Sequence, residues 1–229
     1  AMKLLDTAGG NTKIKKSMLS KAVRIAGLSM FPDDILCPAR HIAGCAKMCL
    51  EGAGRGVMKP VKDGRFRKTM YYHNDTQGFL EQLRRELFNF NKLCKRTGVE
   101  PIARLNTLSD VPWERHGIPQ EFPDIFFYDY TKAAYRLTRT PDNYKLMFSY
   151  SPKKKFQKQV EEALKTDVPM SAVFKDKPFP KTFLGREVID GDRDDLLNVE
   201  AGPVIVGLKY KVVPGVEEAD QNLIVRQAA

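Results

Sequence analysis

Three of the four cysteines in this chain lie close together, and cysteine thiolates are strong ligands for soft metals. Cys37, Cys45 and Cys49 have the spacing Cys-x7-Cys-x3-Cys. Three thiolates leave one metal position open, so an iron–sulfur cluster held in this way would have one iron available to a substrate or cofactor. A structural zinc ion would need a fourth protein ligand, and His41 is the candidate. Three structural thiols without a metal are the remaining interpretation.

The number of cysteines also bears on the compartment in which the protein works. Four cysteines in 229 residues are too few for the disulfide scaffold of a small secreted protein. Cys94 recurs with leucines and phenylalanines at helical spacing, so we expect it to be a buried apolar residue. No stretch approaches the ~18–20 apolar residues of a membrane span, and no apolar leader is present. We therefore expect a cytoplasmic protein without a membrane partner.

Segments with strand character alternate with helical segments along most of the chain. The expected strands are residues 23–30, 102–106, 125–130, 145–150, 171–175, 187–190 and 204–209. The clearest helix is expected over residues 74–96 and the shorter ones over 111–116, 131–138 and 155–166. Strand–helix–strand repeats are typical of parallel βαβ units. The predicted fold is a single α/β domain with a partial (β/α) barrel-like, mostly parallel sheet of about six strands, and an open doubly wound sheet is the alternative.

The chain shows no internal repeat, no low-complexity segment and no linker long enough to divide it. We expect a basic N-terminal lead-in over residues 1–22 and a C-terminal tail over residues 213–229. The α/β domain would occupy residues 23–212 and carry the cysteine loop at residues 37–56.

Polar side chains follow several of the expected strands, and parallel α/β folds bind ligands at the carboxyl ends of their strands. The candidates to position a substrate or move protons are Asp110, Asp129 and Lys132. The candidates to bind a cofactor are Asn106, Ser109, Ser149 and Asp190. Asp, Asn and Ser are also good turn formers and helix caps, so each one alone would have a structural interpretation. We expect the set to line one face together with the cysteine loop.

The chain has 38 basic and 28 acidic residues, a net charge of +10 that favours polyanionic partners. Residues 59–68 are expected to form a basic loop beside the cysteines. Its candidates to hold nucleic-acid phosphates are Lys62, Arg65, Arg67 and Lys68. Phe66, Tyr71 and Tyr72 could stack on bases. The alternative is a solvated loop whose aromatic side chains pack back into the core.

Several short motifs occur in a fixed order over most of residues 28–210. They are Cys37-Pro38, Cys45-x3-Cys49-Leu50, RLN at 104–106, SDVPWE at 109–114, PDI at 123–125, YDYTK at 128–132, IDGD at 189–192 with Asp195, and VIVGLK at 204–209. This set resembles the Gene product 88 family of phage and plasmid proteins. That family is in turn distantly similar to radical S-adenosylmethionine enzymes, which have a partial six-stranded barrel and a three-cysteine loop after the first strand. The resemblance implies an iron–sulfur cluster and S-adenosylmethionine as cofactors, although those enzymes use the spacing Cys-x3-Cys-x2-Cys.

Two functional hypotheses follow. The first is a phage-type metalloenzyme with a three-cysteine, radical-S-adenosylmethionine-like iron–sulfur site that acts on a phosphate-bearing or nucleic-acid substrate. The second is a non-catalytic basic protein that binds nucleic acid or a host protein and holds a structural zinc ion or no metal. In both cases we expect the protein to work in the cytoplasm of a host cell.

Overall fold

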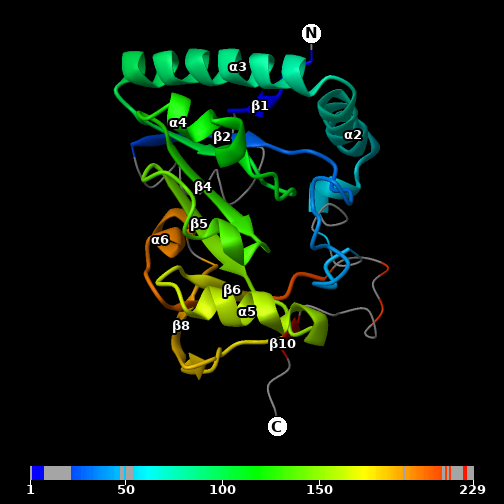
Figure 1. Ribbon diagram of the computed structural model, residues 1–229, viewed down its shortest axis with the longest axis vertical. Helices are drawn as coiled ribbons and strands as arrows, with labels where there is room; N and C mark the ends of the chain where they lie inside the picture. Colours follow the sequence, from blue (N-terminus) through cyan, green and yellow to red (C-terminus); the bar gives the residue numbers. More distant parts are fainter. Residues whose placement is uncertain are drawn as a thin grey trace.

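In the computed structural model of the chain, the described residues are 2–7, 22–46, 49, 54–192, 194–212, 215, 217 and 224–225. Ten strands form one sheet (Figure 1). They are β1 (Leu5–Asp6), β2 (Val23–Leu28), β3 (Glu100–Arg104), β4 (Phe126–Thr131), β5 (Tyr144–Ser149), β6 (Met170–Phe174), β7 (Thr182–Phe183), β8 (Arg186–Asp190), β9 (Ile205–Lys209) and β10 (Ile224–Val225). The helices are α2 (Lys59–Asn74), α3 (Thr76–Thr97), α4 (Ile118–Glu121), α5 (Gln157–Leu164) and α6 (Asp195–Val199). Short 3-10 helices are η2 (Gly54–Val57), η3 (Trp113–His116), η4 (Ala134–Arg136) and η5 (Lys154–Phe156).

The strand order is β1-β2-β3-β4-β5-β6-β9-β8-β7, and the strands from β2 to β8 in this order are parallel. The mostly parallel α/β sheet is therefore confirmed. Its ten strands exceed the sheet of about six that we expected. Seven of them correspond to the seven expected strand segments, and the other three, β1, β7 and β10, have two residues each and show no periodicity in the sequence. In the described part of the chain the sheet runs from β1 at one end to β7 at the other, and a barrel is not confirmed.

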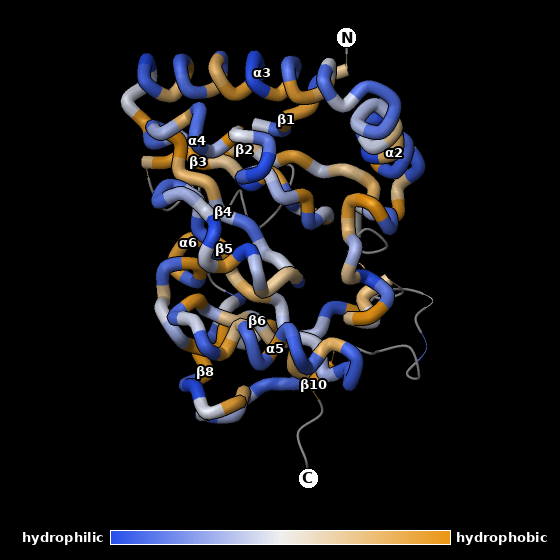
Figure 2. Tube along the Cα trace, viewed as in Figure 1, coloured by the Kyte–Doolittle hydropathy of each residue, from blue (hydrophilic) through white to orange (hydrophobic). Residues whose placement is uncertain are grey.

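Strands β2 to β6 follow one another in the sheet in chain order. Right-handed crossovers that always step in the same direction place their connections on one face of a sheet. A large apolar cluster joins α3, α5 and one face of the sheet, and it includes Leu83, Phe127, Phe148 and Val160. Figure 2 shows the apolar residues of α3 on the side of the helix that faces the rest of the molecule.

Helix α3 was predicted from local signals, and the structure confirms it. The carboxylate of Asp75 caps its first turn by accepting a hydrogen bond of 2.8 Å from Gly78 N. Gly98 ends it in the left-handed conformation, at φ 65°. Cys94 lies on its buried face within the core, as predicted.

Helix α2 occupies the segment that we expected to be a basic loop, so that expectation was wrong. The segment is polar on all sides and has no apolar stripe to reveal a helix, and Pro60 stands in its first turn, where proline is tolerated. The helix is held by side chains of its C-terminal half. Tyr71 and Tyr72 pack edge-on against Phe79 of α3, and Thr69 Oγ1 donates to Phe31 O at 2.9 Å.

The opposite face of the sheet is covered by α6, a helix that was not among those expected from the sequence. Asp194 caps the helix at Leu196 N, and Leu196 and Val199 pack on the sheet. Arg104 Nη1 of β3 donates to Asp195 Oδ2 at 2.9 Å, and the Arg104 guanidinium lies 4.9 Å from the ring centre of Tyr130. This buried ion pair fastens α6 to the sheet.

The chain ends also contribute to the sheet. β1 pairs antiparallel with β2, and the Glu86 carboxylate of α3 accepts from Leu5 N at 2.8 Å. β10 pairs parallel with the end of β6 through Ile224 and Val225. None of the helices in the described part of the chain has both the length and the apolar character that a membrane span requires.

Candidate functional site

The cysteine loop follows β2 in the chain, and residues 29–36 connect it to the carboxyl end of that strand. Leu36 O accepts a hydrogen bond of 2.8 Å from Asp110 N, and Cys37 Sγ donates to Leu108 O at 3.5 Å. Ser151 Oγ, just after β5, donates to Ala43 O at 2.7 Å. The loop is therefore held against the segments that follow β3 and β5, on the edge of the sheet where the parallel strands end.

The three thiols of this loop lie close enough to interact electrostatically. Burial is the largest cause that raises the pKa of Cys37 far above its ordinary value, and the charges of Asp110, Cys49 and Cys45 raise it further. Burial also raises the pKa of Cys45, whose thiol donates to Arg40 O at 3.5 Å. Cys94 takes no part in this cluster, since it lies in the core.

Two cations, Lys132 and Arg40, lie beside this cluster, and Lys132 is the one with the larger effect on Cys45. Its Nζ donates to Ser149 O at 3.0 Å and to Tyr150 O at 2.9 Å, both at the end of β5. Burial lowers the pKa of Lys132 to about 8, while the negative charges of Cys45 and Asp110 act in the opposite direction. An ammonium group has three N–H bonds, so one donor remains for another acceptor.

Asp110 joins Lys132 to a second buried cation. One carboxylate oxygen accepts from Lys132 N at 2.8 Å, and the other accepts from Arg136 Nη1 at 2.5 Å. Burial raises the pKa of Asp110, and the charge of Arg136 opposes that shift. Both oxygens are occupied, so Asp110 positions its neighbours.

Arg136 is the residue that sequence reasoning missed. Its side chain is fully buried (0% exposed), and its Nε and Nη2 each donate to the Glu114 carboxylate at 2.9 Å. Nη2 also donates to Tyr144 OH at 3.1 Å. Arginine is normally exposed, and nothing in the segment YRLTR distinguishes a buried arginine from its exposed neighbours.

Asp129 continues the same network toward the centre of the sheet. Its two carboxylate oxygens accept from Asn106 N at 2.7 Å and from Tyr144 OH at 2.8 Å. Asn106 Oδ1 in turn accepts from Ser109 Oγ at 2.8 Å. Burial raises the pKa of Asp129 to about 7, and the residue is only 1% exposed. These contacts order the loop after β3.

The structure thus brings most of the predicted strand-end residues together, but not all of them. Asn106, Ser109, Asp110, Asp129 and Lys132 belong to one hydrogen-bonded network, which Ser149 joins through its carbonyl.

Two other candidates lie elsewhere. Asp190 of β8 accepts from Lys177 Nζ at 2.7 Å, and its strand is four positions from β4 in the sheet, or about 19 Å. His41 Nε2 contacts Asp34 Oδ1 at 2.7 Å on the surface.

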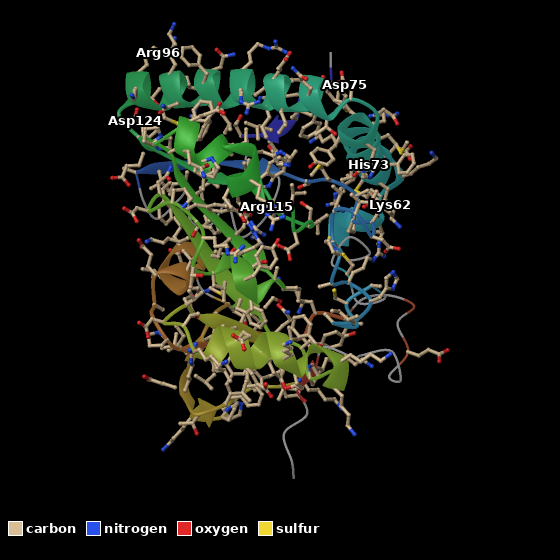
Figure 3. All side chains as sticks on the ribbon, in the orientation of Figure 1. Lys62, His73, Asp75, Arg96, Arg115 and Asp124 are labelled. Atoms are coloured by element: carbon tan, nitrogen blue, oxygen red, sulfur yellow. The ribbon has the colours of Figure 1, made fainter. Side chains whose placement is uncertain are left out.

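The basic residues expected in a loop lie along α2, where Figure 3 labels Lys62. Lys68 is half-buried, and its Nζ donates to Leu4 O at 2.7 Å. Arg65 is half-buried as well, whereas Arg67 is exposed. Phe66 is 52% exposed. Tyr71 and Tyr72 pack against Phe79, so of the three aromatic residues expected to stack on bases only Phe66 is presented to solvent.

The cysteine loop offers thiols, and thiolates are the type of ligand that soft metals prefer. Three thiols come from one loop, and Lys132 supplies a positive charge beside them. In the arrangement seen here, no three His, Cys, Asp or Glu side chains among the described residues form a group that could hold a metal ion.

The chain matches the Gene product 88 family over residues 2–227. It belongs to the Gene product 88 family. The region that matches the Gene product 88 family contains every candidate residue discussed above, from Cys37 to Asp190. Neither a curated protein nor a solved structure matches the chain. The comparisons give no support for a similarity to radical S-adenosylmethionine enzymes.

Proposed function

We propose that this member of the Gene product 88 family is a metalloenzyme whose Cys37, Cys45 and Cys49 hold an iron–sulfur cluster, and that it acts on a phosphate-bearing or nucleic-acid substrate. The observation that carries the proposal is the placement of the three thiols. Cys37 interacts electrostatically with Cys45, Cys49 and Asp110 at the carboxyl edge of a parallel sheet. Cys45 interacts there with Lys132 and Asp110. Ligands of parallel α/β folds bind at that edge.

A cluster held by three thiolates supplies one-electron chemistry and an iron that can bind a substrate or cofactor. The protein's own residues have different tasks. Lys132 balances the charge of the thiolates and directs its third N–H toward an anionic group of the substrate. Asp110 holds Lys132 and Arg136 in place, and Asp129 orders Asn106. S-Adenosylmethionine as a cofactor stays a prediction, which calorimetric titration of the anaerobic protein tests directly.

Metal analysis of protein purified without oxygen tests the proposal. We expect brown protein with broad absorbance near about 400 nm and with stoichiometric iron and acid-labile sulfide. Cys37→Ala, Cys45→Ala and Cys49→Ala should each lose iron, whereas Cys94→Ala, which removes a core thiol, should keep it. Colourless protein with stoichiometric zinc would support the second hypothesis. Anaerobic wild-type protein without iron, after reconstitution with iron and sulfide, would rule the cluster out.

The exposed side of α2 favours a second candidate function, a basic protein that binds nucleic acid with zinc or without a metal. Lys62 and Arg67 flank the exposed ring of Phe66 on this helix. The double variant Lys62→Glu and Arg67→Glu leaves the packed residues Arg65 and Lys68 in place. A low-salt gel-shift assay should lose the nucleic-acid complex in this variant if α2 is the binding surface.

A further inference from the structure

Two arginine side chains lie beside a single exposed tyrosine on the surface of the connections that follow β3 and β4. The guanidinium carbon of Arg115 is 5.1 Å from the ring centre of Tyr135, and that of Arg139 is 5.6 Å from the same point. Tyr135 is 44% exposed, and both arginines are exposed. We call these three residues the Tyr135 cluster. Figure 3 labels Arg115 near the middle of the molecule.

The two positive charges of the Tyr135 cluster have no ion-pair partner among the residues that the structure describes. The acid next to Arg115 in the sequence, Glu114, has both oxygens occupied by Arg136. Each guanidinium carries five N–H donors in a planar fork. Two such forks beside one ring repel each other, and an anion bound between them would remove that repulsion.

The buried network described above sets the geometry of this surface. Arg136 points inward to Glu114, and their sequence neighbours Tyr135 and Arg115 point outward. The buried Arg136–Glu114 pair therefore joins η3 to η4 and places Tyr135 and Arg115 side by side on the surface. Ala134 N donates to Gln159 Oε1 of α5 at 2.9 Å, which fixes η4 from its other side. Arg115 and Tyr135 are thus preorganised on two anchored 3-10 helices, and Arg139 follows η4, where its backbone N donates to Arg136 O at 3.0 Å.

We propose that the Tyr135 cluster binds phosphate groups of a single-stranded nucleic acid. Guanidinium forks match the oxygens of a phosphate, and stacking on an aromatic ring fixes their orientation. Surfaces that combine cations with exposed aromatic rings are typical of proteins that bind single strands. The net charge of +10 favours the approach of a polyanion. This surface is separate from the cysteine loop, so the inference does not depend on the iron–sulfur cluster.

Fluorescence anisotropy with a labelled oligonucleotide of about 20 nucleotides tests the proposal, since this length exceeds the ~4–16 nucleotides of a typical binding site. We expect the double variant Arg115→Ala and Arg139→Ala to bind at least about 10-fold more weakly than wild type at ~50 mM salt. Loss of two phosphate contacts should also reduce the slope of log K against log salt by about 1.4. Arg96→Ala is the matched control, because Arg96 is an exposed arginine at the far end of α3 (Figure 3).

Two further variants separate orientation from charge. Tyr135→Leu keeps both arginines but removes the ring on which they lie. It should weaken binding, while the slope of log K against log salt should stay close to that of wild type. Arg115→Lys with Arg139→Lys should do the same, because a lysine cannot form the planar fork. Thermal unfolding of each variant checks that it is folded, and the lysine variant serves in place of the alanine variant if the latter is not.

The same assay distinguishes a single strand from a mononucleotide or a duplex as the bound molecule. It also distinguishes the Tyr135 cluster from the surface of α2 as the binding site. Competition by an unlabelled single strand, but not by a mononucleotide or a duplex at equal phosphate concentration, supports the proposal. A mononucleotide that competes equally well would show a site for a terminal phosphate and overturn it. Absence of wild-type binding would also overturn it. So would loss of binding in the Lys62→Glu and Arg67→Glu variant but not in the Arg115→Ala and Arg139→Ala variant.

Discussion

Ser151 Oγ donates a hydrogen bond of 2.7 Å to Ala43 O and thereby joins the end of β5 to the middle of the cysteine loop. Both partners are buried. Ser151→Ala should leave a buried carbonyl without its donor and reduce the free energy of unfolding by about 1–3 kcal/mol. The loop thiols should react with a disulfide reagent several-fold faster than in wild type. Ser171→Ala is the control, since its hydroxyl makes a 3.4 Å bond within the sheet and should not change the labelling rate.

Arg136 is buried between Glu114 and Asp110, and removal of its charge would leave two buried carboxylates without the cation that pairs with them. Arg136→Met should therefore lower the free energy of unfolding by about 3–5 kcal/mol, measured by urea denaturation. Arg84 forms a comparable two-bond pair with Glu121, but at the surface. Arg84→Met should cost no more than about 1 kcal/mol. Equal losses in the two variants would show that burial of the Arg136 pair is unimportant.

Asp129 should make stability depend on pH. Burial raises its pKa from 3.8 to about 7, so the folded protein holds a proton that the unfolded chain has already released between these two values. The contribution of this group to stability is complete below pH 3.8 and is lost as the pH rises to about 7. Asp129→Asn cannot titrate, so its urea midpoint should fall less than that of wild type over this interval. Parallel pH profiles for the two proteins would contradict the shifted pKa.

Two glycine substitutions in helices should have opposite signs. Gly98 ends α3 with a positive φ, which an alanine adopts at a cost of about 1–2 kcal/mol. Gly64 lies inside α2, and a Cβ added there would meet nothing closer than the Arg67 side chain at 4.0 Å. Gly64→Ala should therefore stabilise the protein by about 0.5–1 kcal/mol. Thermal unfolding of the two variants measures both effects, and the same sign in both would contradict this account.

Local signals made the strands and α3 predictable. Asp75 and Gly98 mark the ends of α3 in the sequence itself, and the apolar positions between them fall on one side. Helix α2 has no such pattern, because it packs through only a few side chains such as Thr69 and Tyr72. Its helical state depends on its neighbours and not on its own periodicity.

The candidate site was predictable where it depends on the parallel direction of adjacent strands. Asn106 follows β3, and Asp129 lies on β4. These two strands are neighbours both in the chain and in the sheet. Asp190 is separated from them because β9 lies between β6 and β8, an order that no local pattern reveals. The burial of Arg136 likewise depends on two carboxylates from a different segment, Asp110 and Glu114.

The chain order of β3 to β6 in the sheet has a consequence for the folding kinetics. Each of these strands pairs with the next strand along the chain over a short connection, so pairing can extend one crossover at a time without closing long loops. β2 and β10 are different, because about 70 residues separate β2 from its partner β3 and about 50 separate β10 from its partner β6. We therefore expect amide protons of β3 to β6 to become protected early in refolding, and those of β2 and β10 to be protected later.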